Sequence, residues 1–331
     1  MKNVVGGWSD GVNWAKGLLP RSIDSSYIHT GTATIDSDVG SVTTLHMGYT
    51  GLTGTLDIVG GANLTVTTGN GRIGRSGYVN SAGVINMTGG TLTYGASQNE
   101  RLIIGLDSSV ANSEQGSFTI SGGTFAGGIL LGSTVAGGSR DLLRIEGDAA
   151  TIGSANAVTG NGLEVRSTGD MEFIFDETGI STLSYANEQA RFYDGSTILV
   201  DGSAYTGSSD TFTLINATSF YNTVAPTIVL TNFADEISYD YDWDTVNGDL
   251  TVTVDVPVEL VPPHLTIAYA SNSVIVSSSD LNSFASNTLQ EAISLVGGSW
   301  NNISISTGST SNSWVITPLT GSESFYRVIS K

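Results

Sequence analysis

The segment best suited to chemistry is a run of alternating aspartates near residue 240. Asp240, Asp242 and Asp244 occupy every second position, and Asp249 follows shortly after the last of them. Calcium binds to sets of carboxylate oxygens, so these four residues are our candidate calcium ligands. Thr245 stands where an EF-hand loop requires glycine, which excludes that motif. A looser calcium site is one hypothesis, and an acidic edge strand that resists pairing is the other.

Catalytic groups are scarce elsewhere in the sequence. The three histidines, His29, His46 and His264, are far apart, and the chain has no cysteine. A metal centre or a catalytic triad needs several such groups at fixed spacing. We therefore expect isolated structural or surface histidines, no catalytic residue, and no cofactor other than the calcium considered above.

A carbohydrate-cleaving site would need paired carboxylates or a basic proton abstractor. The groups available on the predicted strands are Asp57, Asp107, Asp141, Arg144, Glu146 and Asp148. Arg144 and Glu146 share one face of a strand, with Asp148 just beyond, so these three are the nearest approach to a cluster. A solvated ladder of ion pairs is the simpler interpretation.

These residues lie in a chain that repeats one phrase: alternating apolar residues, a glycine pair, and another apolar residue. The copies span residues 54–64, 83–92 and 116–125, and shorter apolar stretches ending in glycine follow at 72–74, 103–105 and 130–132. Such repetition indicates a solenoid, in which each coil buries its apolar face against its neighbours. The phrase aligns Ile58, Met87, Ile120 and Ile145 as inward residues, and the glycine pairs mark corners that need positive φ.

We predict an all-β protein: a right-handed parallel β-solenoid (β-helix) followed by a small antiparallel β-sandwich. Residues 1–30 form an N-terminal cap with Trp8 and Trp14 as lids, a sugar-stacking aromatic pair being the alternative. Residues 31–255 form the solenoid, with widened coils from about residue 158. Three prolines make 256–263 a stiff linker, and about six strand signals place the sandwich at 264–331.

Charge and hydropathy exclude several classes of partner. The net charge is −19, and the segment from Phe192 to Tyr326 holds 14 acidic residues and no lysine or arginine. Such a surface repels phosphate backbones, so we expect no nucleic-acid partner. The sequence has no 18-residue apolar run, and so no membrane span is expected. The first residues also lack the apolar core of a signal peptide.

Several segments together resemble a known group of proteins. They are the opening Trp-x-x-Gly-x-Asn-Trp at 8–14, the Gly-Gly coils, and the stretches 171–183 and 240–254. These resemble exported bacterial β-solenoids, both autotransporter-passenger-like proteins and those with PEP-CTERM-type sorting tails. The final segment, with Leu289, Gln290, Trp300 and 318–327, is similar to C-terminal modules on such proteins. The resemblance implies an extracellular or cell-surface location and transfers no catalytic residue.

The expected function is that of an extracellular structural or adhesive protein that associates with copies of itself, as in a head-to-tail filament. In the predicted contact, the cap of one copy, through Trp8 and Trp14, meets another copy. It touches either the linker of that copy, at Pro262 and Pro263, or its sandwich. A cell envelope or an extracellular polysaccharide is a further expected partner. The alternative is a polysaccharide-binding or polysaccharide-cleaving β-helix. For binding, a glycan platform would consist of Tyr94, Tyr239, Tyr241 and Trp243.

Overall fold

The computed structural model describes most of the chain as β-strands. The described residues are 6–14, 18–48, 52–67, 71–74, 81–95, 101–105, 115–134, 139–153, 161–221 and 224–257, and six strands beyond them. The chain divides into two compact units, Met1–Pro257 and Val258–Lys331, and this division falls inside the predicted linker. One short 3₁₀ turn, η1 (Gly11–Asn13), interrupts the strands. None of the described residues forms an apolar helix long enough to span a membrane.

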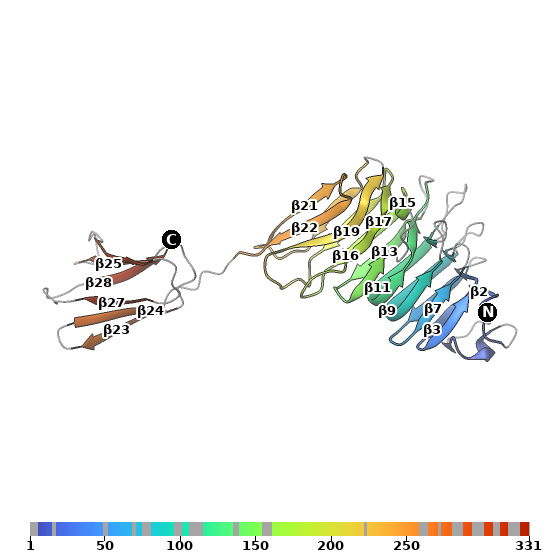
Figure 1. The fold of residues 1–331 in the computed structure, drawn as a ribbon, viewed down its shortest axis with the longest axis horizontal. Coiled ribbons are helices and arrows are strands. Elements are labelled where there is room, and N and C mark those ends of the chain that lie inside the picture. Colours follow the sequence, from blue (N-terminus) through green and yellow to red (C-terminus); the bar gives the residue numbers. More distant parts are fainter. Residues whose placement is uncertain are drawn as a thin grey trace. The chain divides into compact units, whose positions relative to one another are not determined.

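The first unit is a parallel β-solenoid of about seven turns. Figure 1 shows its coils stacked in chain order, from the blue N-terminal strands to the yellow β19. Each coil contributes strands to three faces.

The first face contains β1 (Gly6–Gly7), β3 (Gly31–Ile35), β6 (Thr53–Ile58), β9 (Ala82–Tyr94), β11 (Gln115–Ala126), β13 (Asp141–Glu146), β16 (Gly169–Ile174), β18 (Thr197–Asp201) and β20 (Thr227–Thr231). The second face contains β4 (Asp38–Val42), β7 (Asn63–Val66), the ends of β9 and β11, β14 (Ala150–Gly153), and the beginnings of β17 (Leu183–Phe192) and β19 (Asp210–Tyr221). The third face contains β2 (Ser25–Ile28), β5 (Thr44–Met47), β8 (Gly71–Ile73), β10 (Arg101–Ile104), β12 (Gly128–Leu131), β15 (Asn161–Val165) and the ends of β17 and β19.

The register of the first face confirms the alignment of the repeated phrase. Ile58 pairs with Met87, Met87 with Ile120, and Ile120 with Ile145. All four side chains are at most 1% exposed. Alternation places these residues in the core because successive side chains of a strand point to opposite faces. The phrase therefore marks one face of every coil that carries it.

The coils after residue 158, which were expected to be widened, use lengths of chain that lie within the range of two earlier coils. Phe173, Val200 and Leu230 follow Ile145 in the same column of the first face. Each of these steps is longer than the step from Ile120 to Ile145 and shorter than the step from Met87 to Ile120. The repeated phrase disappears from these coils because other apolar residues fill the same inward positions.

Glycines occupy two corners of the coil, where the backbone turns with positive φ. The second glycine of each pair has this conformation: Gly61 (83°), Gly90 (71°) and Gly123 (85°). So do the glycines that end the third-face strands: Gly48 (62°), Gly74 (73°), Gly105 (69°) and Gly132 (82°). A side chain is strained in this region, which explains why both stretches of the phrase end in glycine.

An antiparallel hairpin ends the solenoid. Its strands are β21 (Ser238–Asp244) and β22 (Asp249–Asp255), and β22 pairs antiparallel with the beginning of β19. The side chains of Leu250, Val252 and Val254 are fully buried and close the core at this end.

The second unit contains two three-stranded antiparallel sheets. One sheet consists of β23 (His264–Ala270), β24 (Ser273–Ser279) and β27 (Asn312–Ile316), and the other of β25 (Asn287–Ala292), β26 (Asn301–Ser306) and β28 (Phe325–Ser330). Six strands in two antiparallel sheets agree with the expected small sandwich.

Candidate functional site

The N-terminal cap seals the solenoid with two tryptophans. Trp8 and Trp14 are 2% and 7% exposed and belong to the main hydrophobic core. Their rings meet edge to face at 4.7 Å, and Trp14 Nε1 donates a hydrogen bond to the carbonyl of Trp8 at 2.9 Å. They are therefore lids, as expected. Because the rings are buried, Trp8 offers no exposed surface to another copy or to a sugar chain, and Trp14 is 7% exposed.

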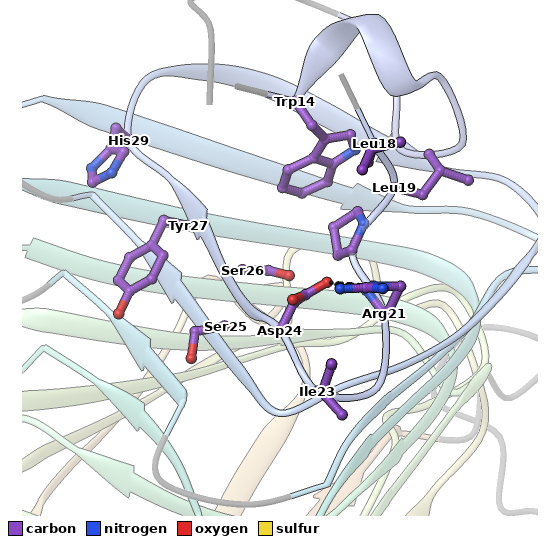
Figure 2. A pocket seen from close by; sticks show the side chains of 11 residues that line it. Trp14, Leu18, Leu19, Arg21, Ile23, Asp24, Ser25, Ser26, Tyr27 and His29 are labelled. Carbon is purple, nitrogen blue, oxygen red and sulfur yellow. Dashed lines mark hydrogen bonds and ion pairs between the residues drawn. The ribbon is translucent and has the colours of Figure 1, made fainter. Parts of the chain in front are cut away.

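A pocket of about 390 Å³ lies beside this cap. Figure 2 shows Trp14, Leu18 and Leu19 on one side and Ser26 and Tyr27 of β2 on the other. Further lining residues are Pro20, Arg21, Ile23, Asp24, Ser25 and His29. Arg21 and Asp24 form an ion pair across 3.3 Å. The Ser26 hydroxyl is buried and has no hydrogen-bond partner, so the pocket wall keeps one unsatisfied polar atom.

The rim of this end is apolar and exposed. Four side chains, Val12, Leu18, Leu19 and Ile23, are 62%, 69%, 44% and 74% exposed. Single exposed apolar residues need no explanation, but a group of them at one end of the molecule is a candidate interaction surface. The sequence analysis did not single out these four residues, because it placed the contacts of the cap on Trp8 and Trp14.

The predicted calcium ligands do not converge. Asp240 and Asp242 alternate along β21, whereas Asp244 lies opposite Asp249 across the hairpin. The Asp244 carboxylate already accepts hydrogen bonds from the backbone of Val246 and Asn247, which hold its pKa below the usual value. Among the described residues, no three acidic or histidine side chains form a group that would hold a metal ion. The other predicted contact residues, Pro262 and Pro263, lie outside the described residues.

The aromatic residues of β21 form a row on the opposite side of that strand. Trp243 stacks on Phe220 with ring centroids 3.9 Å apart, and Tyr239 stacks on Phe233 at 4.7 Å. Tyr239 and Tyr241 are 43% and 42% exposed, so the row is half open to solvent. Tyr94, the fourth member of the predicted glycan platform, is 2% exposed in the core and does not belong to it.

The first face carries an ion-pair ladder where a catalytic cluster was considered. Arg144 Nε donates to Glu172 Oε2 at 2.6 Å, and its Nη1 lies 3.8 Å from Glu146. Glu172 is in register with Arg144 on the next coil. The Asp148 carboxylate accepts a hydrogen bond from the Thr178 hydroxyl at 3.0 Å. These charges are consistent with the ion-pair interpretation.

Two of the three histidines are brought together. His29 and His46 both stack on the ring of Tyr27, at centroid distances of 5.7 and 4.9 Å. The sequence pattern made these histidines look isolated, because their separation along the chain carries no signal without the coil register. His264 begins β23 in the second unit.

A charged cluster on the third face was not foreseen at all. Glu164, on β15, has both carboxylate oxygens engaged: Oε2 accepts from Arg101 Nη1 and Oε1 from Arg166 Nε, each at 2.9 Å. Its side chain is only 5% exposed. Burial raises the pKa of Glu164, but the hydrogen bonds from Arg166 and Arg101 outweigh it and hold the pKa below the ordinary value. Glu164 is therefore a buried anion between two guanidinium groups.

Gly128, on the coil between Arg101 and Glu164, lets the Arg101 side chain reach Glu164. Arg101 is in register with Gly128 on the adjacent coil, and Glu164 lies one coil beyond. A Cβ on Gly128 would lie 2.8 Å from Arg101 Cγ, so the arginine crosses that coil where no side chain stands. Aligning the third-face stretches in the sequence would have placed these charges in neighbouring columns.

No family model, curated protein or solved structure matches this chain.

Proposed function

We propose that this protein is a non-catalytic, extracellular scaffold that associates with copies of itself. In this proposal the apolar N-terminal end of one copy docks on the acidic C-terminal end of the next copy's solenoid. The observation that carries the proposal is the exposure of Leu18, Leu19 and Ile23, which line the pocket at the cap, and of Val12 in the cap's 3₁₀ turn. Burial of apolar side chains of this kind stabilises association by about 25 cal/mol per Å² before the costs of docking.

The opposite end of the solenoid supports a second copy as the occupant. The β21–β22 hairpin presents half-exposed Tyr239 and Tyr241 as an apolar counterpart. The charges of the two ends also differ: the first 30 residues hold three basic and two acidic residues, whereas the segment from Phe192 to Tyr326 holds 14 acidic residues and no lysine or arginine. Complementary charge favours one orientation of docking over others.

The expected location outside the cell has independent support. The chain contains no cysteine, so it can cross or occupy an oxidising space without forming wrong disulfides. The resemblance of its Gly-Gly coils to exported solenoids points the same way.

The test is the oligomeric state in sedimentation velocity experiments over a wide range of protein concentrations. We expect concentration-dependent assembly, and we expect the double variant Leu18→Glu with Ile23→Glu to weaken it by about tenfold or more, because two charges would enter an apolar contact. Both side chains are at least 69% exposed, so the fold should be unaffected.

Leu52→Glu is the matched control, because Leu52 is 44% exposed and lies before β6, away from the end. A wild-type protein that stays monomeric at every concentration would refute self-association. Assembly that is equally strong in the double variant would remove the N-terminal end from the contact.

A further inference from the structure

Arg191 lies beside the Glu164 cluster but takes no part in it. The two residues are in register on adjacent coils of the third face, Glu164 on β15 and Arg191 on β17. Arg101 and Arg166 each donate to one oxygen of Glu164, and among the described residues no hydrogen bond joins Arg191 to this carboxylate. Three of the chain's 12 basic residues thus lie on this face: Arg101 and Arg166, which pair with Glu164, and Arg191 on the next coil.

Aromatic rings hold the Arg191 side chain in place. Its guanidinium carbon lies 4.6 Å from the ring centroid of Tyr193 and 5.2 Å from that of Tyr221. Tyr221 is in register with Arg191 on the following coil. Stacking of this kind orients a guanidinium without using its N–H groups.

The N–H groups of Arg191 have no partner among the described residues. Its Nε is buried without a hydrogen bond, and the described residues supply no ion pair. Removing a charged donor from water without compensation is costly, and functional surfaces are where such groups are kept. The Arg191 Nε is therefore desolvated, and the guanidinium is oriented by the two rings before any counter-ion arrives.

We propose that Arg191, together with Arg166, binds an anionic group, a carboxylate or a sulfate, of an acidic saccharide lying on the third face. Arg191 supplies a planar set of donors that suits either oxyanion. Arg166 adds a second positive charge, because Glu164 neutralises only one of the two arginines it binds. Tyr221, which is 49% exposed, offers an adjacent ring face against which a sugar ring can pack.

The net charge of the chain makes this proposal specific. With a formal charge of −19, most of the surface repels anions. Binding of an acidic polymer therefore requires a local positively charged patch, and Arg101, Arg166 and Arg191 provide one. This site shares no residue with the self-association proposed above, although Tyr221 ends β19, which pairs with strand β22 of the closing hairpin.

Calorimetric titration of the full chain at low ionic strength tests the proposal. The probes are galacturonate oligomers for the carboxylate, heparin-derived oligosaccharides for the sulfate, and neutral gluco-oligosaccharides. We expect saturable binding of at least one acidic probe and none of the neutral one. The substitution Arg191→Gln should weaken binding by about tenfold or more, because a charge-assisted hydrogen bond is lost.

Two further variants separate binding from folding. Arg21→Gln is the matched control, since Arg21 is an exposed arginine at the cap and should leave binding unchanged. Tyr221→Ala should weaken saccharide binding while leaving the thermal unfolding temperature close to that of the wild type. The proposal is overturned if no acidic probe binds, or if a folded Arg191→Gln variant binds the probe as tightly as the wild type. Equal affinity for polyglutamate would overturn the saccharide assignment.

Discussion

Asp141 illustrates how a single buried carboxylate can serve the backbone instead of chemistry. It occupies the column of the first face that holds Gly83 and Gly116 on earlier coils. Its side chain is 2% exposed, and Oδ1 accepts a hydrogen bond from the Gly116 N–H at 2.8 Å. A Cβ on Gly105 would lie 1.9 Å from this carboxylate. The sequence offers Asp141 as an available acid, but the coil register assigns it to a structural hydrogen bond.

The buried Glu164 leads to a prediction about pH. Because its folded-state pKa is depressed, the carboxylate contributes stability above the unfolded pKa of about 4.3 and loses it as the pH falls through the folded value. Glu164→Gln should therefore destabilise the protein at pH 7 by about 1–3 kcal/mol, since Arg101 and Arg166 lose a charged partner. Urea unfolding of both proteins measures this difference.

The difference between wild type and Glu164→Gln should shrink as the pH falls below about 4. Glu146→Gln is the control, because Glu146 is 40% exposed and reaches Arg144 only at 3.8 Å. A destabilisation by Glu164→Gln that stays constant down to low pH would contradict the assignment of a buried anion.

At the scale of the elements, the glycine corners make a prediction that separates backbone strain from crowding. Gly123 has φ of 85°, and a Cβ there would lie 2.5 Å from the carbonyl carbon of Gly89. Gly40 has φ of 73° with no atom within 4 Å, and Gly60 has neither feature. Of the three alanine substitutions, the one at Gly123 should lower the free energy of unfolding the most, by about 1–3 kcal/mol or more, because backbone strain and steric overlap add.

Alanine at Gly40 should cost about 1 kcal/mol from strain alone, and alanine at Gly60 should be neutral or slightly stabilising. Urea unfolding of the three variants gives the ranking. Equal stabilities for Gly123→Ala and Gly60→Ala would show that the corners tolerate side chains.

The limits of sequence-based prediction also show at this scale. The inward column from Ile58 to Ile145 was predictable because alternation and glycine spacing are local signals. The cluster of Arg101, Glu164 and Arg166 was not predicted, because Arg101 and Glu164 are separated by whole coils and meet only through the register. The predicted calcium ligands do not meet for the complementary reason: aspartates at every second position of a strand share one face but are spaced about 7 Å apart along it.

At the scale of the whole molecule, the two compact units predict separable folding. Met1–Pro257 contains the complete solenoid with its cap and closing hairpin, whereas the final residues form their own sheets. A chain ending at Pro257 should therefore unfold cooperatively with a melting temperature close to that of the solenoid transition in the full protein. Circular dichroism and calorimetry measure the cooperativity and the melting temperature of the shortened and the full chain. Loss of the strand signal in the shortened chain would show that the solenoid depends on the second unit.

The variable coil length has a consequence for how such a molecule can change. The core columns keep their register although the step from Met87 to Ile120 takes more of the chain than the step from Ile120 to Ile145. Closing a loop costs only about 0.6 kcal/mol more for each doubling of its length. Segments can thus be inserted, lost or exchanged between coils at small thermodynamic cost. The solenoid therefore suits rapid evolutionary diversification, and foreign peptides grafted at these junctions should be displayed without rebuilding the core.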